Sequence, residues 1–196
     1  METDERATPA RPSFDNEKTS EVMPASTSNP PYEEANFAVN YTAEPHELTP
    51  REMAEIVTKI VAVEGPVHEE EIARRVARLF GKDRTGARIL DNVMRGLRTA
   101  LKIGDVSKDG SFWSHSNAEE IAKVRSRSEA SSSLRKASMI PPIEIKEAIR
   151  QAILNNGELT SDEAVSAVTI AFGFERIGQD LRAVITEQFE VVVNKQ

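Results

Sequence analysis

The chain has 196 residues, with 25 Lys and Arg against 32 Asp and Glu, and its formal net charge of −7 excludes a uniformly basic nucleic-acid coat protein. It has no cysteine, which excludes disulfide frameworks, thiol catalysis and cysteine-ligated metal sites and fits a reducing compartment. No apolar run approaches the roughly 20 residues that a spanning helix needs, and the first residues are polar and acidic, so we expect a soluble cytoplasmic protein that does not enter a membrane.

The first 45 residues are acidic and lack periodicity. They hold 9 acidic and 3 basic residues and are rich in Ser, Thr, Pro and Asn. Their scattered aromatic residues do not repeat at a period of 2 or 3.6, so no core is expected there. We predict that residues 1–45 are a disordered acidic head, which is either a plain linker or a tail that folds on a partner.

Residues 46–116 carry the pattern of three helices followed by a hairpin. A first helix begins after Thr49-Pro50, a cap and a first-turn proline, and stops at Gly65-Pro66. A second helix is expected from about residue 69 to 81, and a third from about 85 to 103. Asp109-Gly110 is a strong turn signal between two short strands. This order is that of a winged helix-turn-helix unit, and a generic three-helix bundle is the alternative.

The third predicted helix has one apolar and one basic face. Its inward residues are expected to be Leu90, Val93, Met94, Leu97 and Leu101. The opposite face carries Arg84, Arg88, Asp91, Arg95, Arg98 and Lys102. In a helix-turn-helix this element enters the major groove, where arginine binds guanine edges or phosphate. The alternative is a solvated face with an Asp91–Arg95 pair.

The hairpin adds two further candidate DNA contacts. Lys108 and Trp113 lie in it, and a wing would place them along the adjacent backbone or minor groove. Trp113 has a second interpretation as a lid over the core. The sequence therefore predicts a site made of Arg84, Arg88, Arg95, Arg98, Lys102, Lys108 and Trp113.

The pattern of the first unit returns 92 residues later. Residues 117–138 are serine-rich and are predicted to be a flexible linker. After it, Pro50, Phe80, Gly81 and Gly86 correspond to Pro142, Phe172, Gly173 and Gly178 without a gap. We infer a second copy of the helical unit over 139–196. Glu190-Val191-Val192-Val193 leaves room for one strand before the sequence ends at Gln196 and for no return strand, so we expect this copy to have a truncated wing.

The second copy differs from the first in charge. At the positions of the basic face it carries Arg176, Asp180, Ala183, Glu187, Glu190 and Asn194. Three acidic residues and one basic residue would repel phosphate. We interpret this copy as a protein-docking or dimerising half, with structural filler as the alternative.

Parts of both copies resemble a known family. The stretches Glu64-Gly65-Pro66-Val67-His68, Leu79-Phe80-Gly81-Lys82-Asp83-Arg84 and Ile140-Pro141-Pro142 resemble the uncharacterised domain at the C-terminus of very large bacterial superfamily-one helicase-like proteins. The resemblance covers roughly residues 46–190. It implies an accessory DNA-binding or docking module beside a motor. The chain itself has no GxxxxGK[ST] loop, so ATP hydrolysis by that route is not expected.

Catalysis has little support in the sequence. His46, His68 and His115 are far apart and do not have metal-ligand spacing, and no nucleophile elbow, dinucleotide loop or calcium loop occurs. We therefore expect a non-enzymatic module without cofactor or metal. Its expected partners are double-stranded DNA at the first unit and a helicase or other protein at the second. The alternative is a protein–protein adaptor or dimerisation module that binds no nucleic acid.

Overall fold

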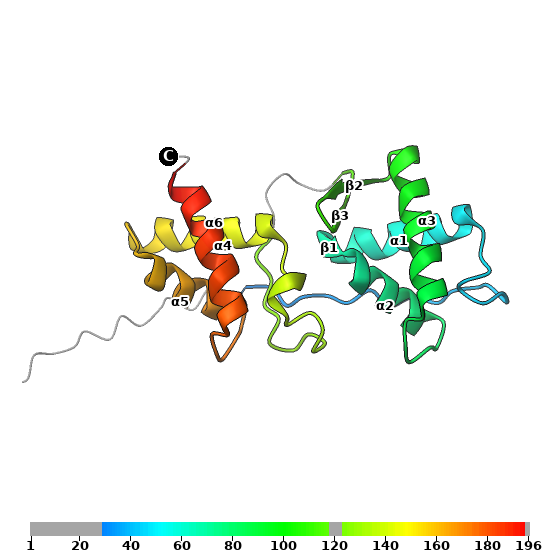
Figure 1. The fold of residues 1–196 in the computed structure, drawn as a ribbon, viewed down its shortest axis with the longest axis horizontal. Coiled ribbons are helices and arrows are strands. Elements are labelled where there is room, and N and C mark those ends of the chain that lie inside the picture. Colours follow the sequence, from blue (N-terminus) through cyan, green and yellow to red (C-terminus); the bar gives the residue numbers. More distant parts are fainter. Residues whose placement is uncertain (1–28, 118–122, 195–196) are drawn as a thin grey trace, which may run out of the picture.

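The computed structural model describes residues 29–117 and 123–194. These residues form a mainly helical protein with one small antiparallel sheet (Figure 1). The first unit contains α1 (Pro50–Glu64), β1 (Val67–His68), α2 (Glu69–Leu79), α3 (Ala87–Ile103), β2 (Val106–Asp109) and β3 (Phe112–His115). A short 3-10 turn, η1 (Ala137–Met139), precedes the second unit, which contains α4 (Pro142–Asn156), α5 (Ser161–Ala171) and α6 (Gln179–Val193). The helices and the hairpin expected from the sequence are present.

Side-chain caps fix where several helices begin. Thr49 and Glu52 form a capping box at α1, in which the Glu52 carboxylate accepts from the Thr49 backbone N–H at 2.8 Å. Thr160 and Glu163 make the same box at α5, also at 2.8 Å. At α2 the ring Nδ1 of His68 accepts from the backbone N–H of Glu70, the second residue of the helix, at 3.2 Å. Each cap satisfies a backbone N–H that has no partner within the helix.

The sheet belongs to the first unit and has the order β1-β3-β2. Trp113 on the central strand lies opposite Val67 on one side and Lys108 on the other. Gly110 takes a φ of 56° in the turn between β2 and β3, a conformation that glycine adopts without strain. The sheet buries Trp113, which is 1% exposed, against the helices.

The buried face of α3 differs from the expected one. Val93 and Leu97 are buried as expected, whereas Leu90 and Leu101 are 37% and 43% exposed. The reason lies at Gly96, where an added Cβ would be 2.5 Å from the Met53 side chain of α1. α3 therefore turns its small residues toward α1 so that the two helices approach closely, and the large leucines on either side face outward. The full set of buried α3 residues is Ile89, Asn92, Val93, Gly96, Leu97 and Ala100.

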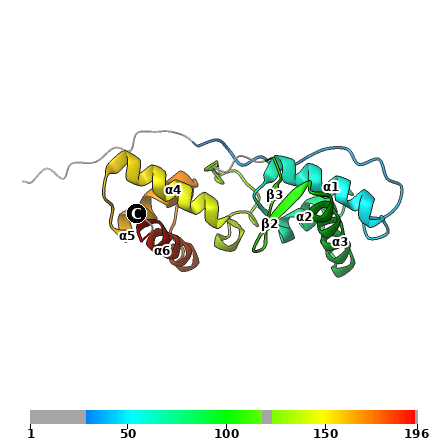
Figure 2. The same ribbon diagram turned by 90° about the horizontal axis from the view of Figure 1, so that it is seen from above.

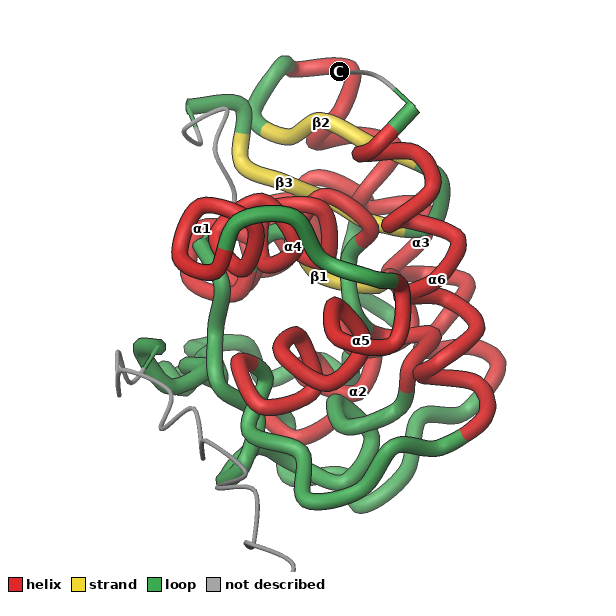
Figure 3. Tube along the Cα trace, turned by 90° about the vertical axis from the view of Figure 1, so that its left-hand side faces the viewer, coloured by secondary structure: helices red, strands yellow, loops and turns green. Residues whose placement is uncertain are grey.

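The two units repeat in space as they do in sequence. The bounds of α4 and α5 are those of α1 and α2 shifted by 92 residues, and α6 begins 92 residues after α3. Along the long axis of the molecule α4 continues the line of α1, and α2 and α5 share one side (Figures 1 and 3). α3 and α6 both lie on one face and run in the same general direction, as the view from above also shows (Figure 2). The units are thus related by a shift along the axis and keep one orientation.

The end of the second unit corrects one expectation. Residues 190–193 were expected as a strand, but they are the last turn of α6. Leu181, Ile185 and Val192 are buried and keep the helical period to that point. Because this period continues, Val192 joins the three-helix core of the second unit, and within 123–194 this unit contributes no strand to the sheet.

Residues 29–45 and 123–136 are not the free head and linker that their composition predicts. The Tyr32 N–H donates to Ser126 O at 2.8 Å, and the Ser126 N–H donates to Pro30 O at 2.8 Å. Tyr32, Ala35 and Leu134 are buried. The two segments pair with each other and fill the space between the units, which composition alone does not reveal. Residues 1–28 and 118–122, to which the same predictions apply, lie outside the described residues.

A buried carboxylate at the end of α1 organises one side of this junction. Glu64 is fully buried and accepts hydrogen bonds from the Tyr32 hydroxyl at 3.1 Å and from the Ala35 N–H at 2.9 Å. Arg75 of α2 pairs with the same carboxylate, with its Nη2 3.0 Å from Oε2. These partners compensate the cost of burying the charge and hold residues 32–35 against the first unit.

A second buried carboxylate, Glu144 of α4, organises the other side. Its partners are Arg125, at 3.1 Å, and Arg127, at 2.6 Å. Burial opposes ionisation of this carboxyl, but the charges of the two arginines outweigh it and hold its pKa below the usual value. Arg125 also donates to the backbone oxygen of Glu64 at 2.7 Å. One arginine therefore connects the end of α1 to the start of α4.

Candidate nucleic-acid interface

The outward face of α3 carries a set of exposed cations. Asp91 is also exposed on this helix, but no ion pair joins it to Arg95 or to another residue of 29–117 or 123–194. We name the basic side chains the α3 basic face: Arg84, in the loop before the helix, and Arg88, Arg95, Arg98 and Lys102. All five are exposed, and among the described residues none has a carboxylate partner.

The arginines of the neighbouring helix α2 behave differently. Arg74 pairs with Glu70 at 3.0 Å, and Arg78 pairs with Glu34 at 2.9 Å. Arg75 is buried against Glu64. The arginines of α2 are thus paired with carboxylates of the protein, whereas, within the described residues, the side chains of the α3 basic face are free to bind an anionic partner.

A hollow lies at the N-terminal end of α3. Its volume is about 430 Å³, and its lining includes His46, Lys82, Arg84 and Arg88. Gly86 is the residue before the helix and has no side chain with which to cap the first N–H groups. The positive end of the helix dipole adds to the cations there, so the electrostatics of this end favour an anion such as a phosphate.

A second hollow of about 480 Å³ adjoins the first. Arg74, Arg78 and Arg84 line it together with Leu90 and Thr85. Lys82 lines both hollows and is held by Glu44, with Nζ 2.7 Å from Oε2. Glu70 and Asp83 also line this hollow, and Arg74, Arg78 and Lys82 are paired with carboxylates. Within the described residues, the unpaired basic surface therefore extends from α3 to Arg84 in the loop before it.

The hairpin contributes less than the sequence predicts. Trp113 is buried in the core and its indole N–H donates to Glu69 at 3.3 Å, so the expected DNA contact of this residue is wrong. Lys108 lies over the Trp113 ring, 5.0 Å from its centroid, and its Nζ is 3.3 Å from the Glu69 carboxylate. Trp113 is the buried residue of β3 while its three neighbours on the strand are half-buried, which favours the core-lid interpretation of the tryptophan.

Sequence reasoning missed parts of this surface. The sequence did not predict that His46 and Lys82 lie near the start of α3. Both residues come from loops, and loops have no hydrophobic period from which their path could be predicted. Sequence reasoning also placed Leu90 and Leu101 in the core, whereas both are exposed among the cations. Gly96 was the available signal, since a glycine in the middle of a helix indicates a close approach by a neighbouring element.

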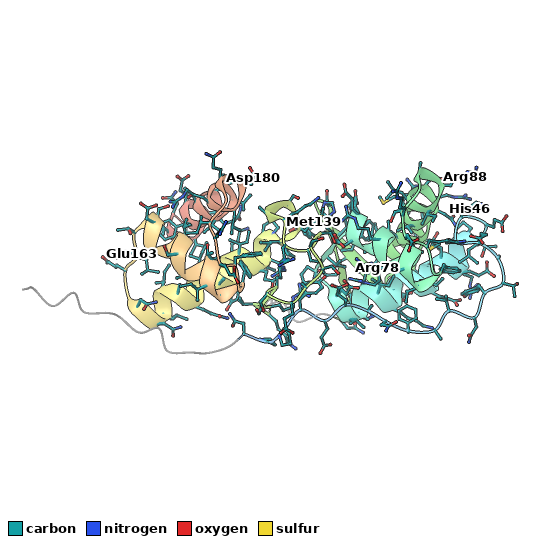
Figure 4. The ribbon with its side chains drawn as sticks, turned by 90° about the horizontal axis from the view of Figure 1, so that it is seen from below. His46, Arg78, Arg88, Met139, Glu163 and Asp180 are labelled. Atoms are coloured by element: carbon teal, nitrogen blue, oxygen red, sulfur yellow. The ribbon has the colours of Figure 1, made fainter. Side chains whose placement is uncertain are left out.

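The corresponding face of the second unit is acidic. We name Asp180, Glu187 and Glu190 the α6 acidic face; all three are exposed, and the described chain offers them no ion pair. They occupy the positions of Arg88, Arg95 and Arg98 shifted by 92 residues. Arg88 and Asp180 lie along the same edge of the molecule (Figure 4). The repeat thus places opposite charges at these three pairs of equivalent positions.

The histidines take structural or surface positions. His46 lines the hollow at α3, His68 caps α2, and His115 accepts from the Asn117 N–H at 3.2 Å. Across 29–117 and 123–194 no group of three or more His, Asp or Glu side chains is placed to hold a metal ion. None of the described helices combines the length and apolar character needed to cross a membrane.

Comparison with known proteins gives one match. No curated protein and no solved structure matches the chain. Residues 43–91 match an uncharacterised family, described as Protein of unknown function (DUF3320). The match extends from the loop before α1 to the first residues of α3, and so contains the hollow and part of the α3 basic face. Over these residues the chain is similar to a family whose function is not established.

Proposed function

We propose that the first unit is a winged-helix domain that binds duplex DNA without catalysing a reaction. The order helix, strand, helix, helix, strand, strand and the three-stranded sheet β1-β3-β2 support this fold. The single observation that carries the function is the α3 basic face, where five cations are exposed without a partner in the described part of the chain. In this proposal α3 is the recognition helix.

The dimensions of α3 suit a groove. At 1.5 Å per residue its 17 residues span about 25 Å, and an α-helix fits the major groove of B-DNA. Arg88, Arg95, Arg98 and Lys102 follow one side of it at spacings of three to seven residues, so they would meet base edges and the flanking phosphates together. Arg84 and the hollow at the helix start would hold one backbone phosphate.

The wing has a secondary part in the proposal. Lys108 is exposed, but its ammonium group forms an ion pair with the Glu69 carboxylate, and this pairing reduces its attraction for phosphate. The proposed DNA contacts are therefore Arg84, Arg88, Arg95, Arg98 and Lys102. Lys108 is a weaker contact to the phosphate backbone of DNA, and Trp113 is not included. A role beside a helicase-type motor stays a prediction that rests on the resemblance of the sequence.

A salt titration tests the proposal. Affinity for a fluorescent duplex of about 20 base pairs, measured by anisotropy, should fall steeply between low and moderate salt, because each neutralised phosphate releases a counterion. Five contacts predict a slope of log K against log salt of about −4.5. A slope near zero, or no duplex affinity at about 50 mM salt, would refute DNA binding by this face.

The α6 acidic face favours a second candidate, a protein adaptor. DNA would be repelled by that face, whereas a basic protein would be attracted to it. Under this candidate the α3 basic face binds an acidic partner and the salt titration with duplex DNA gives no signal. The same experiment therefore decides between the two candidates.

A further inference from the structure

We propose that two copies of this chain associate face to face, with α3 of each copy on α6 of the other. The contact joins the α3 basic face to the α6 acidic face; it forms without DNA, and DNA bound to the α3 basic face would compete with it. Both faces lie on one side of the molecule, and the two helices run in the same general direction (Figures 1, 2 and 3). Figure 4 places Arg88 and Asp180 along a common edge.

The symmetry of the arrangement follows from the repeat. Because the units keep one orientation along the long axis, a two-fold axis that runs parallel to α3 and α6, between the units, places α3 of one copy opposite α6 of the other. The helices then run in the same direction, so that positions 92 residues apart face each other. The contact is isologous, because both copies use the same two surfaces: α3 of each copy contacts α6 of the other.

The side chains at these positions are complementary. Arg88 would face Asp180, Arg95 would face Glu187, and Arg98 would face Glu190. The two-fold axis makes each pair twice. All six side chains are exposed, and within the described chain none already has an ion-pair partner. Opposite charges thus occur at three of the six positions of this helix face, whereas Arg84 and Arg176, in the loops before the helices, carry the same charge.

An apolar pair lies beside the charges. Leu101 of α3 is 43% exposed, and its equivalent on α6, Val193, is 45% exposed. In the same alignment these two side chains face each other near the C-terminal ends of α3 and α6, at one end of the row of charged pairs. Each half of the contact therefore contains an apolar contact next to the charged pairs. This contact would cover Leu101, which the packing of its own unit leaves exposed.

Charge reversal on one face provides the test. R88E/R95E places glutamates opposite Asp180 and Glu187, and D180R/E187R places arginines opposite Arg88 and Arg95. Analytical ultracentrifugation of the full chain at low salt should show a dimer for the unchanged protein, which dissociates as salt is added. Each variant alone should dimerise at least about tenfold more weakly, because like charges then face each other. An equimolar mixture of the two variants should form a heterodimer.

Controls separate this result from misfolding and from a general charge effect. The exposed pair Arg51 and Lys136 gives a matched variant, R51E/K136E, with the same change in net charge, and it should dimerise as the unchanged protein does. Circular dichroism should show native helix content for all variants. The proposal is overturned if the unchanged chain stays monomeric up to about 1 mM at low salt, if either reversal leaves the dimer intact, or if the folded variants do not associate on mixing.

Discussion

Arg88 and Arg95 are the residues at which the DNA-binding proposal is most directly tested. Replacing both with Ala should weaken duplex binding by at least about tenfold and reduce the salt slope by about 2. Both side chains are exposed and unpaired within the described residues, so at a salt concentration that keeps the chain monomeric the free energy of unfolding should change by no more than about 0.5 kcal/mol. Anisotropy measures the first quantity and thermal unfolding the second.

The second unit offers the matched control for this variant. Asp180 and Glu187 occupy the equivalent positions, and replacing both with Ala should leave duplex binding unchanged or strengthen it slightly by relieving repulsion. Equal losses from the two double variants, or no loss from R88A/R95A, would favour the adaptor instead.

Glu34 gives a prediction about pH. Burial opposes its ionisation, but hydrogen bonds from Ser131 and the charge of Arg75 outweigh burial and lower its pKa from 4.5 to about 2. A carboxyl with a depressed pKa stabilises the fold above its unfolded-state value, and this contribution is lost as the pH falls from about 4.5 through 2. Glu34→Gln should therefore lower the unfolding midpoint at pH 7, and its difference from the unchanged chain should shrink toward pH 2. A difference that stays constant over this range would show that ionisation of Glu34 is not involved.

At the scale of the elements, the contact between α1 and α3 makes its own prediction. An added Cβ at Gly96 would lie 2.5 Å from the Met53 Cγ and 3.0 Å from its backbone carbon, so Gly96→Ala should force the helices apart. We expect a loss of about 1–3 kcal/mol in the free energy of unfolding, as for other overpacked cores. Arg98→Ala, at an exposed position of the same helix, is the control and should cost no more than about 0.5 kcal/mol. A variant at position 96 that is as stable as this control would refute the close packing.

The elements were largely predictable from the sequence, and their packing less so. Helix bounds follow from local signals such as the capping box at Thr49 and the turn at Gly110, and the repeat follows from direct comparison. The exposed face of α3 follows from the helical period. Its buried face was misplaced, because Gly96 and Ala100 pack closely but carry a weak hydrophobic signal.

The junction between the units was not predictable from local patterns. Residues 29–35 and 123–136 are polar and aperiodic, and their contacts join positions far apart in the chain; Glu34 and Ser131, for example, are separated by 97 residues. Two buried carboxylates with arginine partners hold these segments in place. Composition reports average hydrophobicity and therefore describes such segments as disordered.

At the scale of the whole molecule, Arg125 should couple the unfolding of the two units. It donates to the Glu64 carbonyl in the first unit and pairs with Glu144 in the second. Trp113 is the sole tryptophan and reports the first unit, whereas circular dichroism reports both. In the unchanged chain the two denaturation curves should coincide. Arg125→Ala should separate them, with the dichroism transition beginning at lower denaturant.

A surface arginine of the second unit is the control for this experiment. Arg150 is exposed and pairs only with Glu147, three residues away, at 3.5 Å within the described chain. Arg150→Ala should leave the two curves together. Curves that stay superimposed in both variants would mean that the junction does not transmit stability between the units.

The place of Glu34 in this junction also bears on the order in which the protein is completed during synthesis. The glutamate leaves the ribosome before α1, but Ser131, which donates to it, follows 97 residues later. At translation rates of about 5–20 residues per second, Glu34 waits roughly 5–20 s for this partner. The core of the first unit, which ends with β3, can form during that interval, while residues 29–35 have nothing from the second segment to pair with. Until residues 125–131 have left the ribosome, the Tyr32 ring therefore lacks Arg125 and Arg127, which cover it in the folded protein, and a chaperone that binds aromatic residues would have its opportunity in that period.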